Sequence, residues 1–567
     1  MTVPAGIDWR PWEAATFATA QRERKPIFVN VAAGWCHWCH VMDKETFGDR
    51  AVQEALRSFI AIRVDADARP DLAERYGEWG WPANALLTPD SEPFTELRGY
   101  QEAAPFRELL QSVAAQAKAG TLRRAVVPPA RPAVTGDLVE LRDQVAASLL
   151  RFYDRKVGGW GGFQKYPHPG PLEASWLEAA RGNEAGRRRA EQTLAGMTQL
   201  LDPVWGGCYQ YSTHHGWTTP HFEKIATVQA ASLASFTEAW QRTGNASYRD
   251  AANRQVRYLT TWLQSAEGPF FTSQDADATR PDGSTVKGER YYGQSDAKRR
   301  TLGLPKLDRS IYADWNGQLL HALARHAAAT GETSSLVAAA RAARRLLATH
   351  QEPSGAFRHA ERPDAILHLR DNAAMGRALL ALSQGSGDPS WAVEAERVAR
   401  WMLANLQAPE GGFWAHSKDP AAAGVFAQRR RPLEENGLAV RFLVEVAWQS
   451  EDEALAAACR TAAERAARVL GDAELVAAEG NLIGQFLLGI EWLLLEPTKA
   501  VVVGAAAGEP LWQAALALAA PGLVVRAPHS GEYPPVPSPA VYLCRGNACS
   551  RPVTDAASLA SELARML

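Results

Sequence analysis

The stretch NVAAGWCHWCHVMDKETF, residues 30–47, decides the fold of the first part of this chain. It joins the end of an apolar run to a segment with helical periodicity, and Cys36 and Cys39 lie at the junction. A cysteine at a helix N-terminus is stabilised as a thiolate by the partial positive charge of free backbone N–H groups. A second cysteine one turn later can attack a mixed disulfide. The spacing therefore predicts a redox pair, with Cys36 as the attacking thiol and Cys39 as the resolving thiol.

Apolar strands alternate with amphipathic helices on both sides of this stretch, which predicts a small α/β domain over residues 1–122. The expected strands are KPIFVNVAA, FIAIRVDAD and NALLTPD, and the expected helices cover residues 12–24, 38–59 and 104–119. Trp81 and Pro82 precede the third strand, where a cis-proline loop would face the cysteine pair and offer an edge to an extended substrate. Pro82 is therefore the cis-proline candidate.

Bulk properties limit the classes of function. The chain has 567 residues, enough for two or three domains, and its formal net charge is −2. This balance argues against nucleic acid as a partner, and no apolar run is long enough to span a membrane. The start MTVPAGIDWRPW lacks a signal-peptide pattern, so a cytoplasmic location is expected. Six cysteines in so long a chain do not make a disulfide framework.

The remainder of the chain is predominantly helical. Residues 123–136 are rich in proline, alanine and arginine and predict a linker. Over residues 137–497 we expect about twelve helices, interrupted by the glycine-aromatic turns DRKVGGWGGF, DPVWGGCYQYS, SAEGPFFTS, EPSGAFRHA and APEGGFWAHS. Such helices in antiparallel pairs predict an (α/α)6 toroid of about six hairpins rather than an open solenoid. Residues 498–567 predict a small C-terminal α/β segment.

If the toroid closes, its loops and the starts of its inner helices face one central pocket. The side chains expected there are His168, His221, Glu223, Lys224, Asp275, Asp277, Trp315, Asn316, Asp371, Glu435 and Asn436. Aromatic rings, carboxylates and amides together suit a sugar or another polyol. Glu223 with Asp275 or Asp277 would serve as acid and base in glycoside cleavage. His221 with His168 would instead move a proton beside a carbonyl.

Structural interpretations of the same residues remain open. Asp275 and Asp277, two residues apart in a loop, are a pattern typical of carboxylates that accept backbone N–H bonds in turns. Glu223 lies near the start of a predicted helix, where a carboxylate stabilises the helix end. Tryptophans beside the turns are typical of packing between helices. Each pocket residue therefore has a structural alternative to the functional prediction.

The cysteines also permit readings other than disulfide exchange. Cys36, Cys39 and His40 fall on one helical face and offer three soft ligands, so zinc is the alternative although no cofactor is expected. A closed zinc site needs a fourth ligand, and none is evident nearby. Cys544 and Cys549 flank RGNA after a strand, and we expect reduced thiols there. A disulfide, a relay with the first pair or a shared metal site are the alternatives.

Several motifs together resemble one family. WCHWCHVM, VDADARPDL, GWPANALLTPDSEPF, GGFQKYPHP, GGCYQYSTHHGWTTPHFEK, SQDADA, ADWNGQLL and CRGNACSRPVTD are similar, in this order, to the spermatogenesis-associated protein 20 / YyaL family. The resemblance runs nearly end to end. It implies a thioredoxin-like domain with redox cysteines Cys36 and Cys39, joined to a six-hairpin toroid of the kind found in glycosidases and N-acylglucosamine 2-epimerases. One departure is Asn30, because thioredoxins carry an aspartate there that relays protons to the second cysteine.

The expected fold is therefore multidomain: a thioredoxin-like α/β domain, an (α/α)6 toroid and a small α/β segment. The first functional hypothesis is thiol–disulfide exchange with a protein dithiol or disulfide partner, with the toroid carrying a ligand pocket. The second is a carbohydrate-active isomerase or hydrolase in which the thioredoxin-like domain is structural or regulatory. The third is a non-catalytic or zinc-binding protein.

Overall fold

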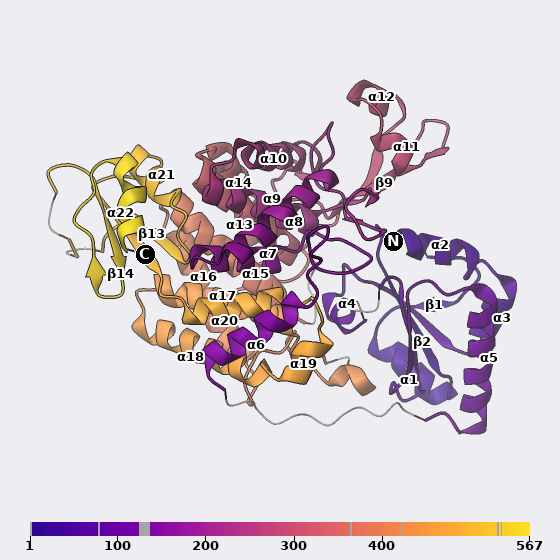
Figure 1. Cartoon of the computed structure of the whole chain (residues 1–567). Coiled ribbons are helices and arrows are strands. Elements are labelled where there is room, and N and C mark those ends of the chain that lie inside the picture. The colour runs from indigo at the N-terminus through magenta and orange to yellow at the C-terminus, as the bar shows by residue number, and fades with distance from the viewer. Residues whose placement is uncertain are drawn as a thin grey trace. The chain divides into compact units, whose positions relative to one another are not determined.

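The computed structural model describes residues 3–76, 80–123, 136–362, 366–420, 422–529, 532–533 and 536–566. Figure 1 traces the chain by residue number. The chain forms two compact units, each with its own core. The first contains Met1–Pro132, Asp364–His368 and Ala415–Pro432, and the second contains Ala133–Pro363, Leu369–Trp414 and Leu433–Leu567. Most of the predicted linker, residues 123–136, lies outside the described residues.

The first unit is built on a five-stranded sheet in the order β1-β3-β2-β4-β5. Its strands are β1 Trp9–Arg10, β2 Ile27–Ala32, β3 Ile60–Asp65, β4 Ala83–Leu87 and β5 Pro93–Arg98. β1, β3 and β2 run parallel, whereas β4 and β5 are antiparallel to their neighbours. The helices are α1 Ala14–Glu23, α2 His37–Glu45, α3 Arg50–Leu56, α4 Pro70–Tyr76 and α5 Ala103–Ala119. This arrangement confirms the thioredoxin-like prediction.

The central strand β2 is buried on both faces, because its side chains alternate between two apolar clusters. Val29 and Val31 pack in one cluster with Phe17 of α1. Phe28 packs in the other with Phe106 of α5. The predominantly apolar run IFVNVA is therefore the sequence signature of a strand that is covered on both sides.

The single helix predicted over residues 38–59 is wrong, because α2 ends before residue 47 and α3 begins at Arg50. Asp49 caps α3, and its carboxylate accepts bonds from the backbone N–H groups of Ala51 and Val52. Gly48 lies in the break, where a Cβ would come within 2.2 Å of the Lys44 carbonyl oxygen. The cap and the glycine were the sequence signals for two helices.

A late segment of the chain completes the core of the first unit. The ring of Phe426 lies 4.3 Å from the ring of Trp12 in an edge contact, and both pack near Phe17. The backbone N–H of Val425 donates to the carbonyl of Ser91 over 3.1 Å. Residues 415–432 therefore belong to this unit, a long-range association that sequence periodicity did not reveal.

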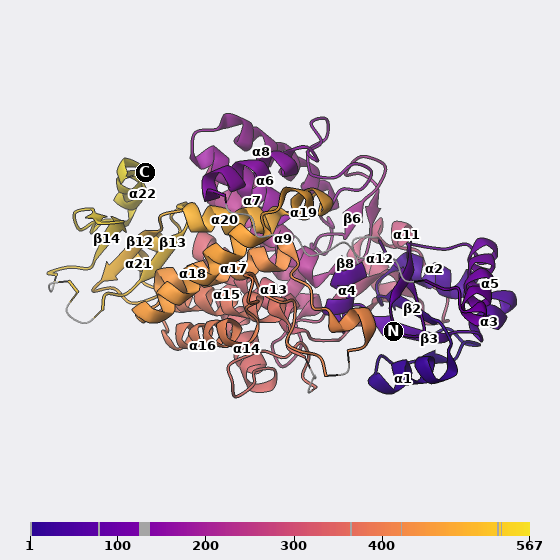
Figure 2. The ribbon, with the colours of Figure 1, turned by 90° about the horizontal axis from the view of Figure 1, so that it is seen from below.

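The second unit is a closed ring of helical hairpins. The inner helices are α7 Pro169–Ala180, α9 Ala226–Thr243, α13 Ala313–Thr330, α15 Leu369–Ser386, α17 Leu433–Gln449 and α20 Gly484–Leu494. Each packs against the next, and α20 packs back against α7. The outer helices are α6 Leu138–Leu150, α8 Glu184–Met197, α10 Ala246–Tyr258, α14 Thr333–Thr349, α16 Ser390–Asn405 and α18 Glu453–Leu470. Figure 2 shows α15 beside α17, with α16 and α18 next to them. The predicted toroid is confirmed.

The glycine-aromatic turns are held by carboxamide side chains at the starts of inner helices. The backbone N–H of Phe270 donates to Asn316 Oδ1 over 2.8 Å, and Asn316 Nδ2 donates back to the Phe270 carbonyl over 3.1 Å. Asn372 makes the same pair of bonds to Phe357. Related pairs join Asn436 to Phe413 and Gln229 to Cys208. One side chain per turn thus satisfies a buried backbone donor and acceptor.

An insertion between α10 and α13 was not predicted. It contains β9 Ser273–Thr279, β10 Thr285–Val286, α11 Gly288–Tyr292, α12 Asp296–Thr301 and β11 Pro305–Asp308. β9 also pairs with β8 Lys224–Ile225, which directly precedes α9. Shorter elements elsewhere are β6 Tyr211–Ser212, β7 Pro220–His221 and α19 Ala473–Ala478. The insertion therefore extends the loop end of the hairpins with a small sheet.

The C-terminal segment confirms the predicted α/β pattern. Its sheet has the order β13-β12-β14-β15, with β12 Thr498–Val503, β13 Leu523–Arg526, β14 Ala540–Arg545 and β15 Ala548–Cys549. Its helices are α21 Pro510–Leu516 and α22 Leu559–Met566. Cys544 and Cys549 form a disulfide, so the expectation of reduced thiols is wrong. The tight turn between β14 and β15 sets the two residues opposite each other.

Among the described residues, no helix combines the length and apolarity that crossing a membrane requires.

Replacing Asn316 with alanine will destabilise the second unit by about 2–4 kcal/mol, because two buried backbone groups of Phe270 lose their partners. Urea unfolding followed by circular dichroism measures this change. Asn183→Ala is the matched control, since Asn183 is an exposed helix cap, and it should cost only about 1 kcal/mol. Equal effects of the two variants would contradict the role given to Asn316.

Candidate functional site

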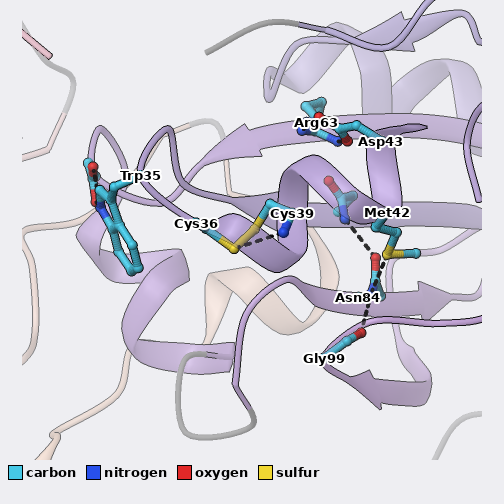
Figure 3. The surroundings of a disulfide bond; sticks show 10 residues. Trp35, Cys36, Cys39, Met42, Asp43, Arg63, Asn84 and Gly99 are labelled. Atoms are coloured by element: carbon cyan, nitrogen blue, oxygen red, sulfur yellow. Dashed lines mark hydrogen bonds and ion pairs between the residues drawn. A yellow bond between two sulfur atoms is a disulfide. The ribbon is translucent and has the colours of Figure 1, made fainter. Parts of the chain in front are cut away.

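Cys36 and Cys39 form a disulfide at the start of α2, with an S–S distance of 2.11 Å and a Cα–Cα distance of 5.2 Å (Figure 3). Cys36 is the N-cap residue, and its sulfur accepts a bond from the backbone N–H of Cys39 over 3.0 Å. This N–H and the helix dipole would stabilise a thiolate on Cys36 after reduction. Both residues are buried, with Cys36 4% exposed and Cys39 1% exposed.

The loops that carry Trp35 and Trp81 are in contact with each other. The peptide bond between Trp81 and Pro82 is cis, directly before β4. The ring of Trp35 makes an edge contact with Trp81 at 6.3 Å, and its indole N–H donates to the Asp67 carboxylate over 2.9 Å. Trp35, which precedes the first cysteine, is therefore fixed in orientation by two contacts.

Uncharged groups lie where a thioredoxin aspartate was expected. Asn30 Nδ2 donates to Asn84 Oδ1 over 2.7 Å, and both residues are buried. Asn84 Nδ2 in turn donates to the Gly99 carbonyl over 3.4 Å and lies 3.8 Å from the sulfur of Met42 (Figure 3). An amide pair cannot carry a proton as a carboxyl group can. This amide pair therefore cannot relay a proton to or from Cys39.

A buried ion pair joins the last turn of α2 to the sheet. Arg63 of β3 makes two bonds to the Asp43 carboxylate, at 2.7 and 2.8 Å (Figure 3). The guanidinium also lies over the rings of Trp9 and Phe47. Sequence reasoning did not single out this pair. Its signal was an arginine between two apolar residues, Ile62 and Val64, of the strand IAIRVD.

The zinc alternative involves the same sulfur atoms. In the disulfide form Cys36 and Cys39 are bonded to each other and neither sulfur is a thiolate ligand. His40, the third proposed ligand, is exposed. Zinc binding therefore stays a prediction for the reduced form alone.

In the second unit, a cavity of about 480 Å³ runs between the six inner helices. Its wall is rich in alanine, which leaves space along the ring axis. Residues 516 and 520–525 of the C-terminal segment line part of the same cavity. The most chemically distinctive lining side chains are His321, Arg325, Arg377, Arg441, Glu445 and Trp492.

Charged groups in this cavity are paired between inner helices. Arg377 of α15 makes two bonds to Glu445 of α17, at 2.9 and 2.8 Å. Arg441 of α17 pairs with Glu173 of α7 at 2.6 Å and lies 4.2 Å above the ring of Trp492. Burial makes an unpaired charge costly, so these pairs fix the polar wall of the cavity.

The pKa values of two lining side chains, His321 and Glu434, are shifted in opposite directions. Burial and the nearby guanidinium groups, chiefly that of Arg377, hold the pKa of His321 well below its usual 6.5, so the imidazole is neutral at pH 7. Burial raises the pKa of Glu434 from 4.5 to about 7, although its carboxylate accepts the backbone N–H of Gln485 over 2.6 Å. The cavity thus offers a proton acceptor and a carboxyl group that is partly protonated at neutral pH. Sequence reasoning missed His321.

The predicted pocket residues do not converge on this cavity. Glu435 lines it, whereas Asn316 and Asn436 are buried and hold the turns at Phe270 and Phe413. Trp315 packs against Tyr312 at a ring distance of 6.2 Å.

Lys224 lies in a separate buried ion cluster rather than in the central cavity. Its ammonium donates to Asp202 Oδ2 over 2.7 Å and to the Gly206 carbonyl over 2.9 Å. Arg299 of the insertion makes two further bonds to Asp202. Burial lowers the pKa of Lys224 to about 8 even though Asp202 opposes that shift. The cluster ties the insertion to the turn before β6, which is a structural role.

Glu223 lies near Asp275 and Asp277 of β9, within the insertion. Burial, and to a lesser extent the charges of the two aspartates, raises the pKa of Glu223 to about 7. Asp277 accepts the backbone N–H of Gly288 over 2.9 Å and pairs with Lys287 at 2.8 Å. Asp277 therefore makes the structural contacts expected of a carboxylate that accepts a backbone N–H bond. Glu223, with its raised pKa, retains the features of a proton donor.

His168 and His221 are connected through two tyrosine rings. His221 stacks on Tyr211 at 4.2 Å, Tyr211 stacks on Tyr166 at 4.9 Å, and Tyr166 contacts His168 at 5.7 Å. Burial lowers the pKa of His168 to about 4. Two rings that lie between the histidines do not favour their use as a facing acid–base pair.

Asp371 belongs to a buried group with Asp314 and His359. Its Oδ1 lies 2.9 Å from His359 Nδ1 and accepts the backbone N–H of Asp314 over 2.9 Å. The side chain of Arg370 pairs with Asp314 at 2.9 Å. The three residues have the donor types and the proximity of a cation site, but the guanidinium already supplies positive charge.

Comparisons with known proteins agree with this anatomy. Residues 2–122 match the Thioredox_DsbH family model, described as a protein of unknown function, DUF255. Mouse (Mus musculus) spermatogenesis-associated protein 20 is 29% identical over 321 residues, which cover 50% of this chain and 41% of the mouse protein. Thiol:disulfide interchange protein DsbD 1 of Pseudomonas aeruginosa is 30% identical over 120 residues, covering 20% of this chain and 19% of that protein.

Among solved structures, the crystal structure of a D-mannose isomerase is similar to this chain with a TM-score of 0.48 and 11% sequence identity. The aligned part covers 63% of this chain and 97% of the isomerase chain. The chain spans about two fifths of the length of the mouse relative, at 41%. The comparisons confirm the resemblance predicted from the sequence motifs: over half of its length this chain is similar to spermatogenesis-associated protein 20, and its N-terminal thioredoxin-like domain matches the Thioredox_DsbH family model.

Proposed function

We propose that this protein is a thiol–disulfide oxidoreductase that works through Cys36 and Cys39. The observation that carries the proposal is their disulfide at the N-terminus of α2, next to the cis bond before Pro82 in a thioredoxin-like domain. The similarity of this domain to a thiol:disulfide interchange protein supports the same chemistry.

The proposed reaction moves two electrons. In the reduced protein, the Cys36 thiolate attacks a disulfide of a partner protein, and one partner sulfur leaves as a thiolate. Cys39 then attacks the sulfur of Cys36, which releases the second partner thiol and forms the Cys36–Cys39 disulfide. Two protons pass to the partner sulfurs, and a dithiol donor returns this protein to its reduced form. The partner is thus a protein disulfide or dithiol, and the expected cytoplasmic location would favour the reduced form.

Cys36→Ser will abolish reduction of insulin disulfides, because the attacking sulfur is lost. Cys39→Ser will stop turnover after one attack and accumulate a mixed disulfide on Cys36, visible by intact mass spectrometry. Cys459→Ala, which removes a buried free cysteine of α18, is the matched control and should retain full activity. Inactivity of the reduced wild-type protein towards every disulfide tested would contradict the proposal.

We propose as a second function that the central cavity binds a small polar ligand such as a sugar or another polyol. Its volume of about 480 Å³ lies within the usual range of ligand pockets. Trp448 and Trp492 supply aromatic surface for the apolar face of a sugar ring, and the paired arginines and glutamates supply groups for its hydroxyls. The neutral His321 would accept a proton and Glu434 would donate one, as an isomerase or hydrolase requires.

The raised pKa of Glu434 predicts a pH-dependent stability. A carboxyl group with a pKa of about 7 when folded and 4.5 when unfolded favours the folded state in its protonated form. Stability is therefore fully present below pH 4.5 and declines by about 3 kcal/mol as the pH rises to 7. Glu434→Gln should remove this part of the decline in urea unfolding measured at pH 4.5, 6 and 7. An unchanged pH dependence would show that Glu434 is ionised in the cavity.

Ala234→Trp will fill the cavity and abolish binding of any sugar that the wild-type protein binds, as measured by calorimetry across a panel of monosaccharides and disaccharides. Val337→Trp is the matched control, because Val337 is 66% exposed on α14, outside the ring. It should leave the affinity unchanged. Circular dichroism confirms that both variants fold. A sugar that binds equally well to both variants, or a panel without a single binder, would contradict the cavity as the site.

A further inference from the structure

The disulfide between Cys544 and Cys549 joins two facing residues of the C-terminal hairpin. Cys544 lies in β14 and Cys549 in β15, with their Cα atoms 4.0 Å apart. β15 is at the edge of its sheet, next to β14 alone. Among the described residues of this segment, no strand pairs with the outer backbone edge of β15.

The hairpin does not depend on this bond for its pairing. Val541 and Val553 exchange two backbone bonds, at 2.8 and 2.9 Å. The Ser550 N–H donates to the Leu543 carbonyl over 2.7 Å, and the Leu543 N–H donates to Ser550 Oγ over 3.1 Å. The disulfide closes a loop with a sequence separation of only 5, and short loops gain the least stability from a crosslink. Stabilisation of the hairpin thus explains little of why the Cys544–Cys549 disulfide is present.

The two sulfur-bearing residues differ in access and in partners. Cys549 is exposed, whereas Cys544 is 7% exposed. The hydroxyl of Tyr533 lies 3.5 Å from the sulfur of Cys544. An attacking thiolate reaches the exposed sulfur more readily, and a hydroxyl beside the other sulfur can donate a hydrogen bond to it as it leaves.

We propose that Cys544 and Cys549 form a second redox-active site, whose reductant is a protein dithiol of the CxxC class. The reductant's thiolate attacks the sulfur of Cys549, the Cys544–Cys549 bond breaks, and Cys544 leaves as a thiolate that takes up a proton. The second thiol of the reductant then attacks the mixed disulfide and releases Cys549. The reductant ends as a disulfide, and this chain gains two thiols and two electrons. The exposed edge strand suits such a reductant, because thioredoxin-type proteins bind extended segments.

The direct test uses the full chain carrying Cys36→Ser and Cys39→Ser, so that its result is independent of the function proposed for the first pair. The probe is a thioredoxin whose resolving cysteine is replaced by serine. We expect a mixed disulfide on Cys549, identified by peptide mass spectrometry of the native protein. Attachment to Cys544, or attachment only after denaturation, would overturn the proposal.

Two further variants test the assigned roles. Tyr533→Phe should slow reduction by intact thioredoxin by about three- to tenfold, the equivalent of one modest hydrogen bond. Tyr542→Phe is the matched control, since the neighbouring Tyr542 ring lies 4.4 Å from that of Tyr533, and it should leave the rate unchanged. Reduction should also leave the circular dichroism spectrum unchanged. A loss of strand signal on reduction would show that the bond is structural and would overturn the proposal.

Discussion

Closure of the inner helical ring is the constraint on which the second unit depends. Because α20 packs against α7, each inner helix has an inner neighbour on both flanks. A helix in that position has no flank in water, so small residues and paired charges replace the usual polar face. The loops at the helix starts must also satisfy their backbone groups without solvent. The amides of Asn316, Asn372 and Asn436 meet this requirement at three turns.

The same closure accounts for the chemistry of the cavity. Arginines inside the ring must find carboxylates, and those pairs link α15 to α17 and α17 to α7. Burial, together with the positive charge of these arginines, keeps His321 neutral. Burial has the opposite effect on Glu434, whose protonated form it favours. One environment therefore separates the protonation states of two side chains, as acid–base chemistry requires.

The two disulfides are placed by different physical features. The Cys36–Cys39 bond lies at a helix N-terminus, where backbone N–H groups favour a thiolate. The Cys544–Cys549 bond lies on an edge strand, where exposure of one sulfur and a tyrosine hydroxyl beside the other distinguish the attacked sulfur from the leaving one. In the functions proposed above, the first pair exchanges repeatedly with partner proteins. The second pair is a substrate for such exchange.

The sequence by itself determined the thioredoxin-like order of elements, the cysteine pair and the alternation of helices with glycine-aromatic turns. These features are local, because periodicity, caps and turn residues act within a few positions along the chain. Only the tertiary structure decided that Asn316 and Asn436 hold turns, that His321 faces the cavity and that Cys544 is bonded to Cys549. The sequence does not distinguish a polar residue that faces a cavity from one that holds a backbone turn, or a free cysteine from a bonded one. Which of these it meets depends on contacts between distant segments, and those exist only once the ring and the sheets have closed.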